Sequence, residues 1–358
     1  MIFTYLIGAG ASANTIPVIK DFDKELYLFA DYIDKYIFEK HYYEESYVNK
    51  DYPYEIRKKF VDDIRWLAKE YGCHSSVDTF AKKLFLSSRK GDLILLKEII
   101  SEFILYKHIK KGIDIRYDAF FAALLRISNS GFLELPENIR IISWNYDKQI
   151  EASIAQFRIK DTINDNIEDF LQVCPRSNQK KFDENKFCLF KINGSIGGTI
   201  TKDGKYLPIG MDYSLVGDNI HKIEEDNILF NIFLRYNLIK DIKKNIDKTI
   251  NNKIDEYPTI IYSWEDTEVF NSVREKALMT TKYTSVLTII GYSFPTFNRE
   301  IDKKIIVNMT ALKKVIIQSP KESIEGVKQR FLSLIGPYST VEVELNTNVE
   351  EFVIPFEY

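Results

Sequence analysis

The feature that most constrains the fold is a short apolar run at residues 2–7, which leads directly into a glycine-rich turn at residues 8–13. The run, IFTYLI, is rich in β-branched and aromatic side chains, so it predicts a buried strand. The turn, GAGASA, follows at once. A strand that runs into Gly-x-Gly is typical of nucleotide-binding folds, in which bare backbone comes up to a pyrophosphate. The sequence therefore predicts a nucleotide site at the end of its first strand.

Each small residue of this turn is expected to have its own role. Gly8 is expected to make the tight turn, because a residue without a Cβ atom adopts positive φ without a clash. Gly10 is expected to let the backbone approach the phosphates, with the next N–H groups facing the negative charge. Ala13 fits the small third position of the dinucleotide fingerprint. On its own, Gly-x-Gly is a weak signal and often only a tight turn.

The chain departs from an ordinary dinucleotide site at Pro17, which stands where the crossover helix would run. Proline inside a helix costs about 3 kcal/mol, so a helix from Ser12 is expected to be a single turn. A loop then follows through Asp21 and Phe22. The strand, the turn, the early proline and the Asp-Phe pair form a much more specific signal together than Gly-x-Gly does alone.

Length and composition allow a large α/β protein. A chain of 358 residues suggests two or three domain-sized units, or one large α/β domain with insertions. Its hydrophobic content of 45%, with 14% aromatic residues, is enough for a substantial core. The formal net charge of −3 gives no general basic footprint for nucleic acid, although 49 Lys and Arg residues leave a local patch open.

The cysteines and the apolar runs narrow the class further. Cys73, Cys174 and Cys188 lie far apart without a Cys-x-x-Cys pair, so no structural zinc site is expected and reduced thiols in a cytoplasmic protein are favoured. The first residues carry no basic region before the apolar run, so no signal peptide is predicted. No stretch approaches the roughly 20 apolar residues of a membrane helix. We therefore expect no metal and no membrane attachment.

Residues 23–130 predict mostly helix, because their apolar side chains recur at helical spacing. The expected helices cover residues 23–37, 55–71, 93–109 and 119–128, with a further capped start at residues 75–80 that leads to Phe85. Residues 42–54 are rich in tyrosine, for which we favour packing between helices over a base-stacking platform.

The second half of the chain predicts strands. They are expected at residues 140–144, 187–192, 259–262, 285–290, 315–317 and 341–343. Apart from the last they are mostly continuous apolar runs, typical of a parallel sheet covered on both faces. Between residues 192 and 259 we expect a hairpin around Asp203-Gly204 and a helical part at residues 220–254. Its lysine-rich stretch, residues 240–253, predicts a solvated helix face first and a partner surface second.

Polar and glycine residues follow four of these strands, where ligands bind in doubly wound sheets. The first strand leads to Gly8, Ala9, Gly10, Ala11 and Ser12, and the second to Trp144, Asn145, Tyr146 and Asp147. The third leads to Asn193, Gly194 and Ser195, and the fourth to Gly291, Tyr292, Ser293, Phe294 and Pro295. One such strand end is ordinary, whereas four in this order are hard to attribute to turn chemistry alone.

The order of these motifs resembles the sirtuin family, and more closely its NAD-hydrolysing branch in prokaryotic antiviral defence. Residues 8–12 with Pro17, Asp21 and Phe22 are similar to the family's opening signature, and residues 143–147 to its Thr-x-Asn-x-Asp motif. Residues 191–195 lie where the family has His-Gly, and residues 291–293 resemble the late turn that holds the adenosine half. The match covers the sheet and its loops.

The resemblance implies NAD as the bound substrate, without a metal. The residues that it implies for NAD binding are Gly8, Ala9, Gly10, Ala11, Ser12, Pro17, Asp21, Phe22, Gly194, Ser195, Gly291, Tyr292 and Ser293. Those that it implies for catalysis are Asn145, Asp147 and Asn193.

Two departures from the family pattern matter. The four zinc-binding cysteines of protein deacylases are absent, which argues against a deacylase with a peptide cleft. Asn193 stands where the family has its catalytic histidine, and asparagine cannot accept a proton near neutral pH. The four histidines of the chain do not fall at a predicted strand end, and they are His41, His74, His108 and His221. Of these, His74 is the least unlikely base.

Loss of the histidine does not end the chemistry, because cleaving the nicotinamide–ribose bond expels a neutral group from a cation and needs no general acid. The site has to stabilise an oxocarbenium-like ribose and place a water molecule. Asn145 is expected to bind the ribose or the water, Asp147 to supply charge or act as base, and Asn193 to orient ribose hydroxyls. Alternatively, Asn145 and Asp147 only cap the next helix, or Asp147 only binds ribose.

The sequence thus predicts an α/β fold with a doubly wound, mostly parallel Rossmann-like sheet, formed by residues 1–22, 135–200 and 256–358. A helical insertion at residues 23–134 and a smaller one at residues 201–255 are expected to pack over its ligand edge. We expect a cytoplasmic NAD⁺ hydrolase of antiviral defence that is oligomeric and works with a hexameric motor ATPase. The alternatives are a non-catalytic NAD- or ADP-ribose-binding regulatory subunit and a nucleic-acid-acting subunit, the latter supported only by scattered lysines.

Overall fold

The computed structural model describes residues 1–17, 22–38, 52–157, 167–175, 182–201, 206–208, 225–237, 256–336 and 340–358. Its centre is a sheet of seven parallel strands in the order β12-β11-β10-β1-β4-β6-β5. The strands are β1 (Ile2–Ile7), β4 (Ile139–Ser143), β5 (Val173–Cys174), β6 (Cys188–Lys191), β10 (Thr284–Ile290), β11 (Lys314–Gln318) and β12 (Glu342–Asn346). The predicted fold class, a doubly wound and mostly parallel α/β sheet, is confirmed.

The strand order reverses at β1. The chain passes from β1 to β4 and β6 on one side, and it later returns to β10 on the other side. In open α/β sheets, this reversal places a crevice outside the carboxyl ends of the strands. The turn after β1 and the turn after β10 therefore meet at the position where such folds bind ligands.

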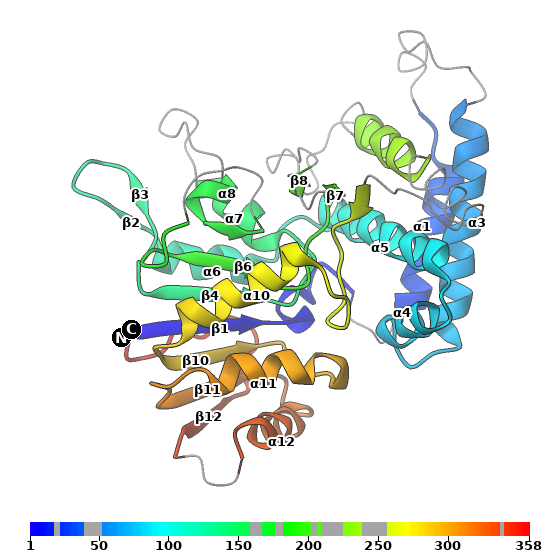
Figure 1. Cartoon of the computed structure of the whole chain (residues 1–358). Helices are drawn as coiled ribbons and strands as arrows, with labels where there is room; N and C mark the ends of the chain where they lie inside the picture. Colours follow the sequence, from blue (N-terminus) through cyan, green and yellow to red (C-terminus); the bar gives the residue numbers. More distant parts are fainter. Residues whose placement is uncertain are drawn as a thin grey trace.

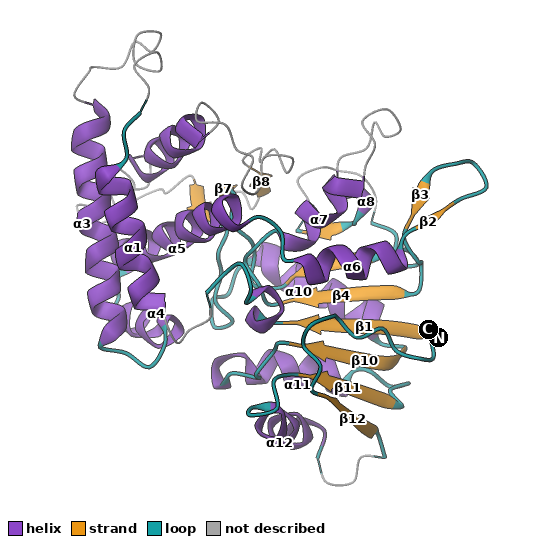
Figure 2. Cartoon of the chain, turned by 180° about the vertical axis from the view of Figure 1, so that it is seen from behind, coloured by secondary structure: helices purple, strands orange, loops and turns teal. Residues whose placement is uncertain are grey.

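Helices cover both faces of the sheet. Figure 2 shows α6 (Ile115–Leu124) in front of β4, and its aromatic side chains share a core cluster with β1, β4 and α7 (Gln149–Phe157). Figure 1 shows the opposite face, with α10 (Glu268–Thr281) and α11 (Arg299–Val307) in front. These two helices and α12 (Ile324–Ile335) form a second core cluster with β4, β6, β10 and β11. Burial on both faces explains why the inner strands are continuous apolar runs.

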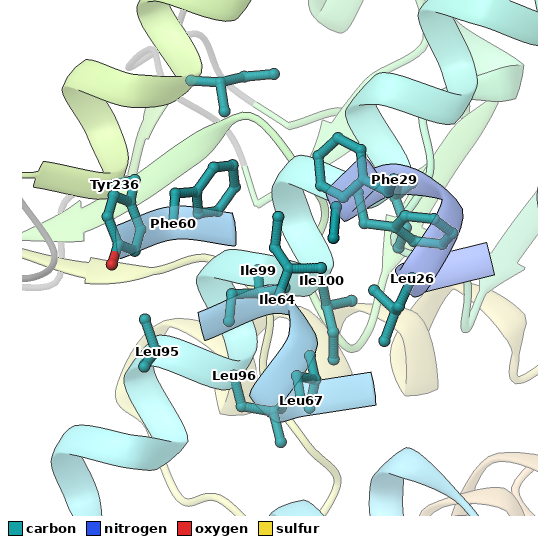
Figure 3. Close-up of a cluster of buried hydrophobic side chains, with 14 of the residues drawn as sticks. Leu26, Phe29, Phe60, Ile64, Leu67, Leu95, Leu96, Ile99, Ile100 and Tyr236 are labelled. Atoms are coloured by element: carbon teal, nitrogen blue, oxygen red, sulfur yellow. The ribbon is translucent and has the colours of Figure 1, made fainter. Parts of the chain in front are cut away.

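A helical part lies beyond the carboxyl ends of the strands (Figure 1). It consists of α1 (Phe22–Lys35), α3 (Tyr52–Gly72), α4 (Val77–Leu86), α5 (Lys90–Lys111) and the helical residues 225–237. Figure 3 shows its core, where Phe29, Phe60 and Ile64 interdigitate with Ile99 of α5 and Tyr236. Because these side chains come from elements far apart in the sequence, their burial joins residues 225–237 to the helices of residues 22–111.

The smaller elements complete the description. A hairpin is formed by β2 (Arg126–Ile127) and β3 (Leu133–Glu134), and a separate antiparallel sheet by β7 (Gly198–Thr201), β8 (Tyr206–Pro208) and β9 (Glu256–Pro258). Short helices are η1 (Ala9–Ser12), α8 (Ile167–Phe170) and η3 (Thr296–Asn298). The pairing of β7 with β8 confirms the predicted hairpin, although its turn, Asp203-Gly204, lies outside the described residues.

Two predicted elements are wrong. Residues 259–262 form no strand in the described structure, because this run leaves β9 and passes the end of β6, where the Ile261 N–H donates to the Asn193 carbonyl at 2.9 Å. Its apolar side chains are buried, and an apolar run signals burial without saying what the backbone pairs with. The helix expected at residues 119–128 is α6, which ends at Leu124 and gives way to β2.

The other predictions lie close to the observed bounds. The capped start at residues 75–80 is confirmed, since the Ser76 side chain accepts a hydrogen bond from the Thr79 N–H at 3.1 Å. The tyrosine-rich residues 42–51 and the lysine-rich residues 240–253 lie outside the described residues. The division of the chain at residues 23–134 and 201–255 stays a prediction, and α6 within the first insertion packs on the sheet.

Candidate functional site

The turn after β1 begins with extended backbone at Gly8. Gly8 has φ −123° and ψ −177°, which is extended backbone, so the expected positive φ at Gly8 is wrong. Its lack of a side chain matters for another reason, because a Cβ atom there would lie 2.6 Å from the Tyr292 Cα. The short helix η1 ends at Ser12 and turns follow it, which confirms the single turn of helix expected before Pro17.

Gly10 and Gly291 pack backbone against backbone. A Cβ atom on Gly10 would lie 2.8 Å from the Gly291 Cα, and one on Gly291 would lie 2.3 Å from the Ala11 nitrogen. The Gly10 N–H donates to the Gly291 carbonyl at 2.9 Å, and the Ala11 N–H donates to the Gly8 carbonyl at 2.9 Å. These two N–H groups are therefore used within the fold. Gly10 thus serves the contact with Gly291, and the expectation that the N–H groups after it face a phosphate stays a prediction.

Three of the expected residues meet around a buried hydroxyl. The Ser12 Oγ donates to the Asp147 Oδ2 at 2.9 Å and accepts from the Asn145 Nδ2 at 3.3 Å. The Asn145 Nδ2 also donates to the Gly8 carbonyl at 3.0 Å. The ends of β1 and β4 are thus joined by side-chain hydrogen bonds, as the positions of these residues after parallel strands predict. The Tyr117 hydroxyl lies 3.1 Å from the same Ser12 Oγ.

Asp147 also binds the helix that follows it. Its Oδ1 accepts from the Gln149 N–H, the first residue of α7, at 3.1 Å. Both carboxylate oxygens of Asp147 are therefore hydrogen-bonded within the chain. The alternative that Asp147 caps the next helix is correct as a description of its contacts, while Asn145 instead holds the turn after β1.

The residues that hold the turn after β1 through hydrogen bonds to its backbone carried no signal in the sequence. Arg116 is buried and forms a bidentate ion pair with Asp114, with Nε 2.9 Å from Oδ1 and Nη2 2.5 Å from Oδ2. The same guanidinium donates to the Ala11 carbonyl at 3.1 Å. The Asp114 N–H in turn donates to the Gln149 Oε1 at 2.8 Å. Only the fold brings Arg116, which is about a hundred residues away in sequence, under the turn.

A second buried pair lies at the end of β6. The Lys191 Nζ lies 3.6 Å from the Glu151 Oε2, and it donates to the Asp147 carbonyl. Both side chains are only 1% exposed. This lysine thus anchors the turn that carries Asp147 to the neighbouring strand.

Asn193 and Gly194 lie at the same sheet edge. Asn193 is 6% exposed, and its Oδ1 has no hydrogen-bond partner. Gly194 has φ +82°, and a Cβ atom on it would lie 1.7 Å from the Thr259 carbonyl oxygen, so only glycine fits. Ser195 is buried, and its carbonyl accepts from the Thr259 Oγ1. These residues position Asn193 and the passing segment 259–262.

Tyr292 belongs to a buried polar group beside the turn. Its hydroxyl donates to the Asp302 Oδ2 at 2.8 Å and accepts from the Asn298 Nδ2 at 3.1 Å. The Trp144 Nε1 donates to the Asp302 Oδ1 at 3.1 Å, and the Trp144 ring stacks on Tyr292 with centroids 5.7 Å apart. Burial raises the pKa of Asp302 to about 7. The Tyr292 side chain thus links β4, β10 and α11.

Some expected site residues lie elsewhere. Phe22 packs in the helical core, with its ring centroid 5.3 Å from that of Tyr71 and 5.2 Å from that of Phe103. Pro17 is half-buried, and Ser293 and Ala9 are exposed. Asp21 lies outside the described residues. The sheet edge therefore brings together the residues after β1, β4, β6 and β10, whereas Phe22 is not among them.

The two histidines among the described residues, His74 and His108, lie in different parts of the helical part. His74 follows α3, and its Nδ1 lies 2.7 Å from the Glu70 carbonyl oxygen. His108 of α5 is fully buried, with its Nδ1 3.3 Å from the Gln149 Nε2. Burial lowers the pKa of His108, and the charge of Asp147 opposes this shift. His108 thus lies beside Gln149 at the start of α7, while His41 and His221 lie outside the described residues.

The described residues were compared with the requirements of a metal site and of a membrane-spanning helix. No three His, Cys, Asp or Glu side chains of the described ranges gather into a group that could hold a metal ion. Among the helices that the structure describes, none combines the length and apolar character of a membrane span.

The comparisons with known proteins find likeness of structure alone. No protein-family model matches the sequence, and no curated protein matches it. The solved structure of Sir2Tm bound to a propionylated peptide is 11% identical, with a TM-score of 0.35, over 98% of this chain and 89% of that chain. A second solved structure, on the structural basis for sirtuin substrate affinity, is 9% identical, with a TM-score of 0.34, over 98% of this chain and 88% of that chain.

Proposed function

We propose that the protein is an NAD⁺ hydrolase that releases nicotinamide and ADP-ribose. One observation carries the proposal, namely the meeting of Ser12, Asn145 and Asp147 with the bare Gly8 backbone where the strand order reverses. Doubly wound folds bind nucleotides at this reversal. Four motifs in the order of a sirtuin-like NAD-binding chain converge there, apart from Phe22, while Asp21 lies outside the described residues.

The residues present fit NAD in two respects. The close packing of Gly8 against Tyr292 and of Gly10 against Gly291 holds the turn after β1 in one conformation at the strand ends, where doubly wound folds bind nucleotides. Buried polar groups are nearly always hydrogen-bonded, so the unpaired Asn193 Oδ1 is available to a bound ribose hydroxyl. Asn145 and Asp147 hold the turn in place, and Asn193 is the one expected catalytic residue with a free buried acceptor.

Hydrolysis of NAD⁺ requires few catalytic groups, because nicotinamide leaves as a neutral molecule. The C1′–nitrogen bond of NAD⁺ breaks, its electron pair stays on nicotinamide, and nicotinamide leaves as a neutral molecule. A water oxygen then bonds to C1′ and gives up a proton. The protein has to bind the dinucleotide, stabilise positive charge on the ribose and accept that proton.

The proposal is tested by incubating the full chain with NAD⁺ and measuring nicotinamide by chromatography. Asn193→His restores the histidine of the resembled family, and general-base catalysis contributes about 10²–10⁴-fold, so turnover is expected to rise by up to that factor. A wild type that is already fast and is slowed by histidine gives Asn193 a role of its own. If wild type and Asn193→His both release nothing, the protein is not a hydrolase.

NAD binding is tested separately through Ala9, which is exposed at the turn. Ala9→Glu adds a negative charge beside the expected pyrophosphate and is expected to weaken ADP-ribose binding at least tenfold in calorimetry. Ala119→Glu adds the same charge on the exposed side of α6 and serves as the control. Gly10→Val is unsuitable for this test, because its side chain would strike Gly291 and disturb the turn itself.

A second candidate is a non-catalytic subunit that senses NAD or ADP-ribose. The observation that favours it is the saturation of Asp147, both of whose carboxylate oxygens are bonded within the chain. Tight ADP-ribose binding without nicotinamide release, in wild type and in Asn193→His, identifies this candidate.

The proposal extends to a role in antiviral defence, with self-association and a hexameric motor ATPase as partner. Its support is the resemblance of the motifs alone. Light scattering of the purified chain, with and without a hexameric motor ATPase as candidate partner, tests the assembly. A monomer under all these conditions contradicts it.

A further inference from the structure

The helical part turns one face of α4 toward the sheet edge. The Lys82 Nζ lies 4.9 Å from the centroid of the Trp264 ring, and Trp264 stacks on Tyr262 with centroids 4.7 Å apart and an interplanar angle of 1°. Asp78 stands four residues before Lys82, so both side chains project from the same face of the helix. Asp78 therefore faces the segment that crosses the end of β6.

Three tyrosines report the position of the Asp78 carboxylate. Its negative charge contributes to the raised pKa of Tyr146, Tyr262 and Tyr292, which follow β4, β9 and β10 respectively. Burial is the larger cause in each case. These contributions agree with the Lys82–Trp264 contact, which sets α4 beside the segment that crosses the end of β6, although α4 belongs to the helical part.

The Asp78 carboxylate is accessible and unpaired. The residue is partly exposed, and in the described structure its carboxylate has neither a hydrogen-bond nor an ion-pair partner. Surrounding protein atoms nevertheless raise the pKa of Asp78 to about 6 by desolvation. A partly exposed carboxylate whose pKa is raised in this way is suited to proton transfer near neutral pH.

Two buried polar atoms without a hydrogen-bond partner lie in the segments at the end of β6. The Tyr262 hydroxyl is buried without a partner, as is the Asn193 Oδ1. The Asn193 side chain lowers the pKa of Tyr146, which burial raises, and the charge of Tyr146 contributes to the raised pKa of Tyr262. Buried polar atoms are nearly always hydrogen-bonded. The unpaired Tyr262 hydroxyl and Asn193 Oδ1, both beside Tyr146, therefore indicate a place for a polar ligand.

The other charges around Asp78 are already engaged. Glu265 forms an ion pair with Lys97 of α5 at 2.6 Å and accepts from the Tyr262 N–H at 2.8 Å. On α4 itself, Lys82 lies over the Phe85 and Trp264 rings, and Lys83 lies 3.4 Å from the His74 Nε2. From α3, the Tyr71 hydroxyl faces the Asp78 charge with a raised pKa, chiefly through burial. Asp78 is the carboxylate left for a ligand.

We propose that Asp78 is the proton acceptor of the hydrolysis, placed on the helical part opposite Asn193. This rests on the proposed NAD⁺ hydrolase function. As the C1′–nitrogen bond breaks and nicotinamide leaves with the electron pair, the attacking water bonds to C1′ and its proton passes to the Asp78 carboxylate. Asn193 and Tyr146 orient the ribose or the water, and Asp78 does the work for which asparagine has no basic atom.

The proposal is tested with Asp78→Asn and Asp78→Glu in the full chain, by steady-state nicotinamide release from pH 5 to pH 9. Asp78→Asn is expected to lower kcat by about 10²–10⁴-fold, with KM within about twofold, because the lost contribution belongs to proton transfer. Wild-type kcat is expected to fall as the pH drops through about 6, where the carboxylate gains a proton, and Asp78→Asn is expected to lack this acid limb. Asp78→Glu keeps a carboxylate and is expected to retain more activity and an acid limb.

Asp118→Asn is the matched control, because Asp118 also stands in the first turn of a ten-residue helix and its side chain is exposed. Thermal unfolding and ADP-ribose calorimetry of each variant show that the fold and the binding site persist. Wild-type release with unchanged kcat and acid limb in Asp78→Asn overturns the role of Asp78 and leaves the proposed function standing. A wild type that binds ADP-ribose but releases no nicotinamide overturns the proposed function and the role of Asp78 with it.

Discussion

At the scale of single residues, the glycines of the site are required by their neighbours in the fold. Gly8 makes room for Tyr292, Gly10 for Gly291, and Gly194 for the Thr259 carbonyl. Sequence motifs built on glycine usually suggest a ligand, whereas here the close approach is between two segments of the chain. A ligand still benefits, because segments packed this closely hold the turn in one conformation.

Gly194→Ala and Gly131→Ala separate strain from collision. Both glycines have nearly the same φ, +82° and +83°, but a Cβ atom on Gly131 would meet nothing within 4 Å. Gly131→Ala is expected to cost about 1–2 kcal/mol of unfolding free energy, the cost of a left-handed residue. Gly194→Ala is expected to cost clearly more, because its Cβ would lie 1.7 Å from the Thr259 oxygen. Urea denaturation measures both, and equal costs contradict the contact with Thr259.

Asn145→Ala tests whether this amide is structural. The change removes the donor to the Gly8 carbonyl and to the Ser12 Oγ, and leaving a buried acceptor unpaired costs about 1–3 kcal/mol. We expect a loss of unfolding free energy of that size in urea denaturation, together with weaker ADP-ribose binding. Asn138→Ala, whose Nδ2 contacts the Met1 carbonyl at the surface, is expected to change stability by less than about 0.5 kcal/mol. Unchanged stability with lost nicotinamide release assigns Asn145 to catalysis instead.

At the scale of elements, α11 is tied to the ends of β4 and β10 through one carboxyl group. Asp302 accepts from the Trp144 indole and from the Tyr292 hydroxyl, so the turns after both strands depend on it. Burial raises its pKa to about 7, although both hydrogen bonds favour the ionised form. The protonation of Asp302 is thus linked to the position of α11 against the sheet.

The pH dependence of stability follows from the sign of this shift. Asp302 has a pKa of about 7 when folded and 3.8 when unfolded, so the folded state binds more protons between these values. The stability contribution of Asp302 is therefore largest below about pH 4 and falls as the pH rises to about 7. At about 1.4 kcal/mol per pKa unit, the fall is on the order of 4 kcal/mol.

Asp302→Asn is expected to remove this fall. Urea denaturation of wild type and variant at pH 4, 5.5, 7 and 8 measures it as the pH-dependent difference between the two proteins. Glu300→Gln, on the exposed side of the same helix, is expected to leave the wild-type slope unchanged. A difference between wild type and Asp302→Asn that is constant with pH contradicts the raised pKa.

At the scale of the whole molecule, one buried ion pair connects the helical part to the segment before α10, and a second lies within the helical part. Lys97 of α5 meets Glu265 in the segment that leads to α10, with only 6% and 14% of their side chains exposed. Arg235 meets Glu102 of α5 in a second pair, with 16% and 2% exposed. Glu265 also accepts from the Tyr262 N–H, so the first pair ties α5 to the segment that crosses the end of β6.

Breaking the Lys97–Glu265 pair is expected to cost more than replacing it. Glu265→Ala leaves a buried ammonium group without its partner and is expected to destabilise the protein by about 3–5 kcal/mol. The double variant Lys97→Met with Glu265→Met removes both charges, and such replacements are often neutral or stabilising. A double-mutant cycle in urea denaturation gives the coupling, and the double variant being less stable than Glu265→Ala contradicts the assignment.

The sequence by itself determined most strands of the central sheet, most helices and the order of the motifs. Residues 2–7, 285–290 and 315–317 are continuous apolar runs, and such a run specifies a buried strand of a parallel sheet through local chemistry. The strand ends then place Ser12, Asn145 and Asp147 at one edge, because parallel strands present their carboxyl ends together.

Only the tertiary structure decided which groups meet and which stay unpaired. Gly10 and Gly291 are separated by most of the chain, and Asp78 reaches the ends of the strands from a helix that pattern alone places in another part. Residues 259–262 are apolar like a strand, yet they cross the end of β6 without joining the sheet. An apolar pattern records that a side chain is buried, whereas the partner depends on contacts between distant segments, for which local sequence carries no signal.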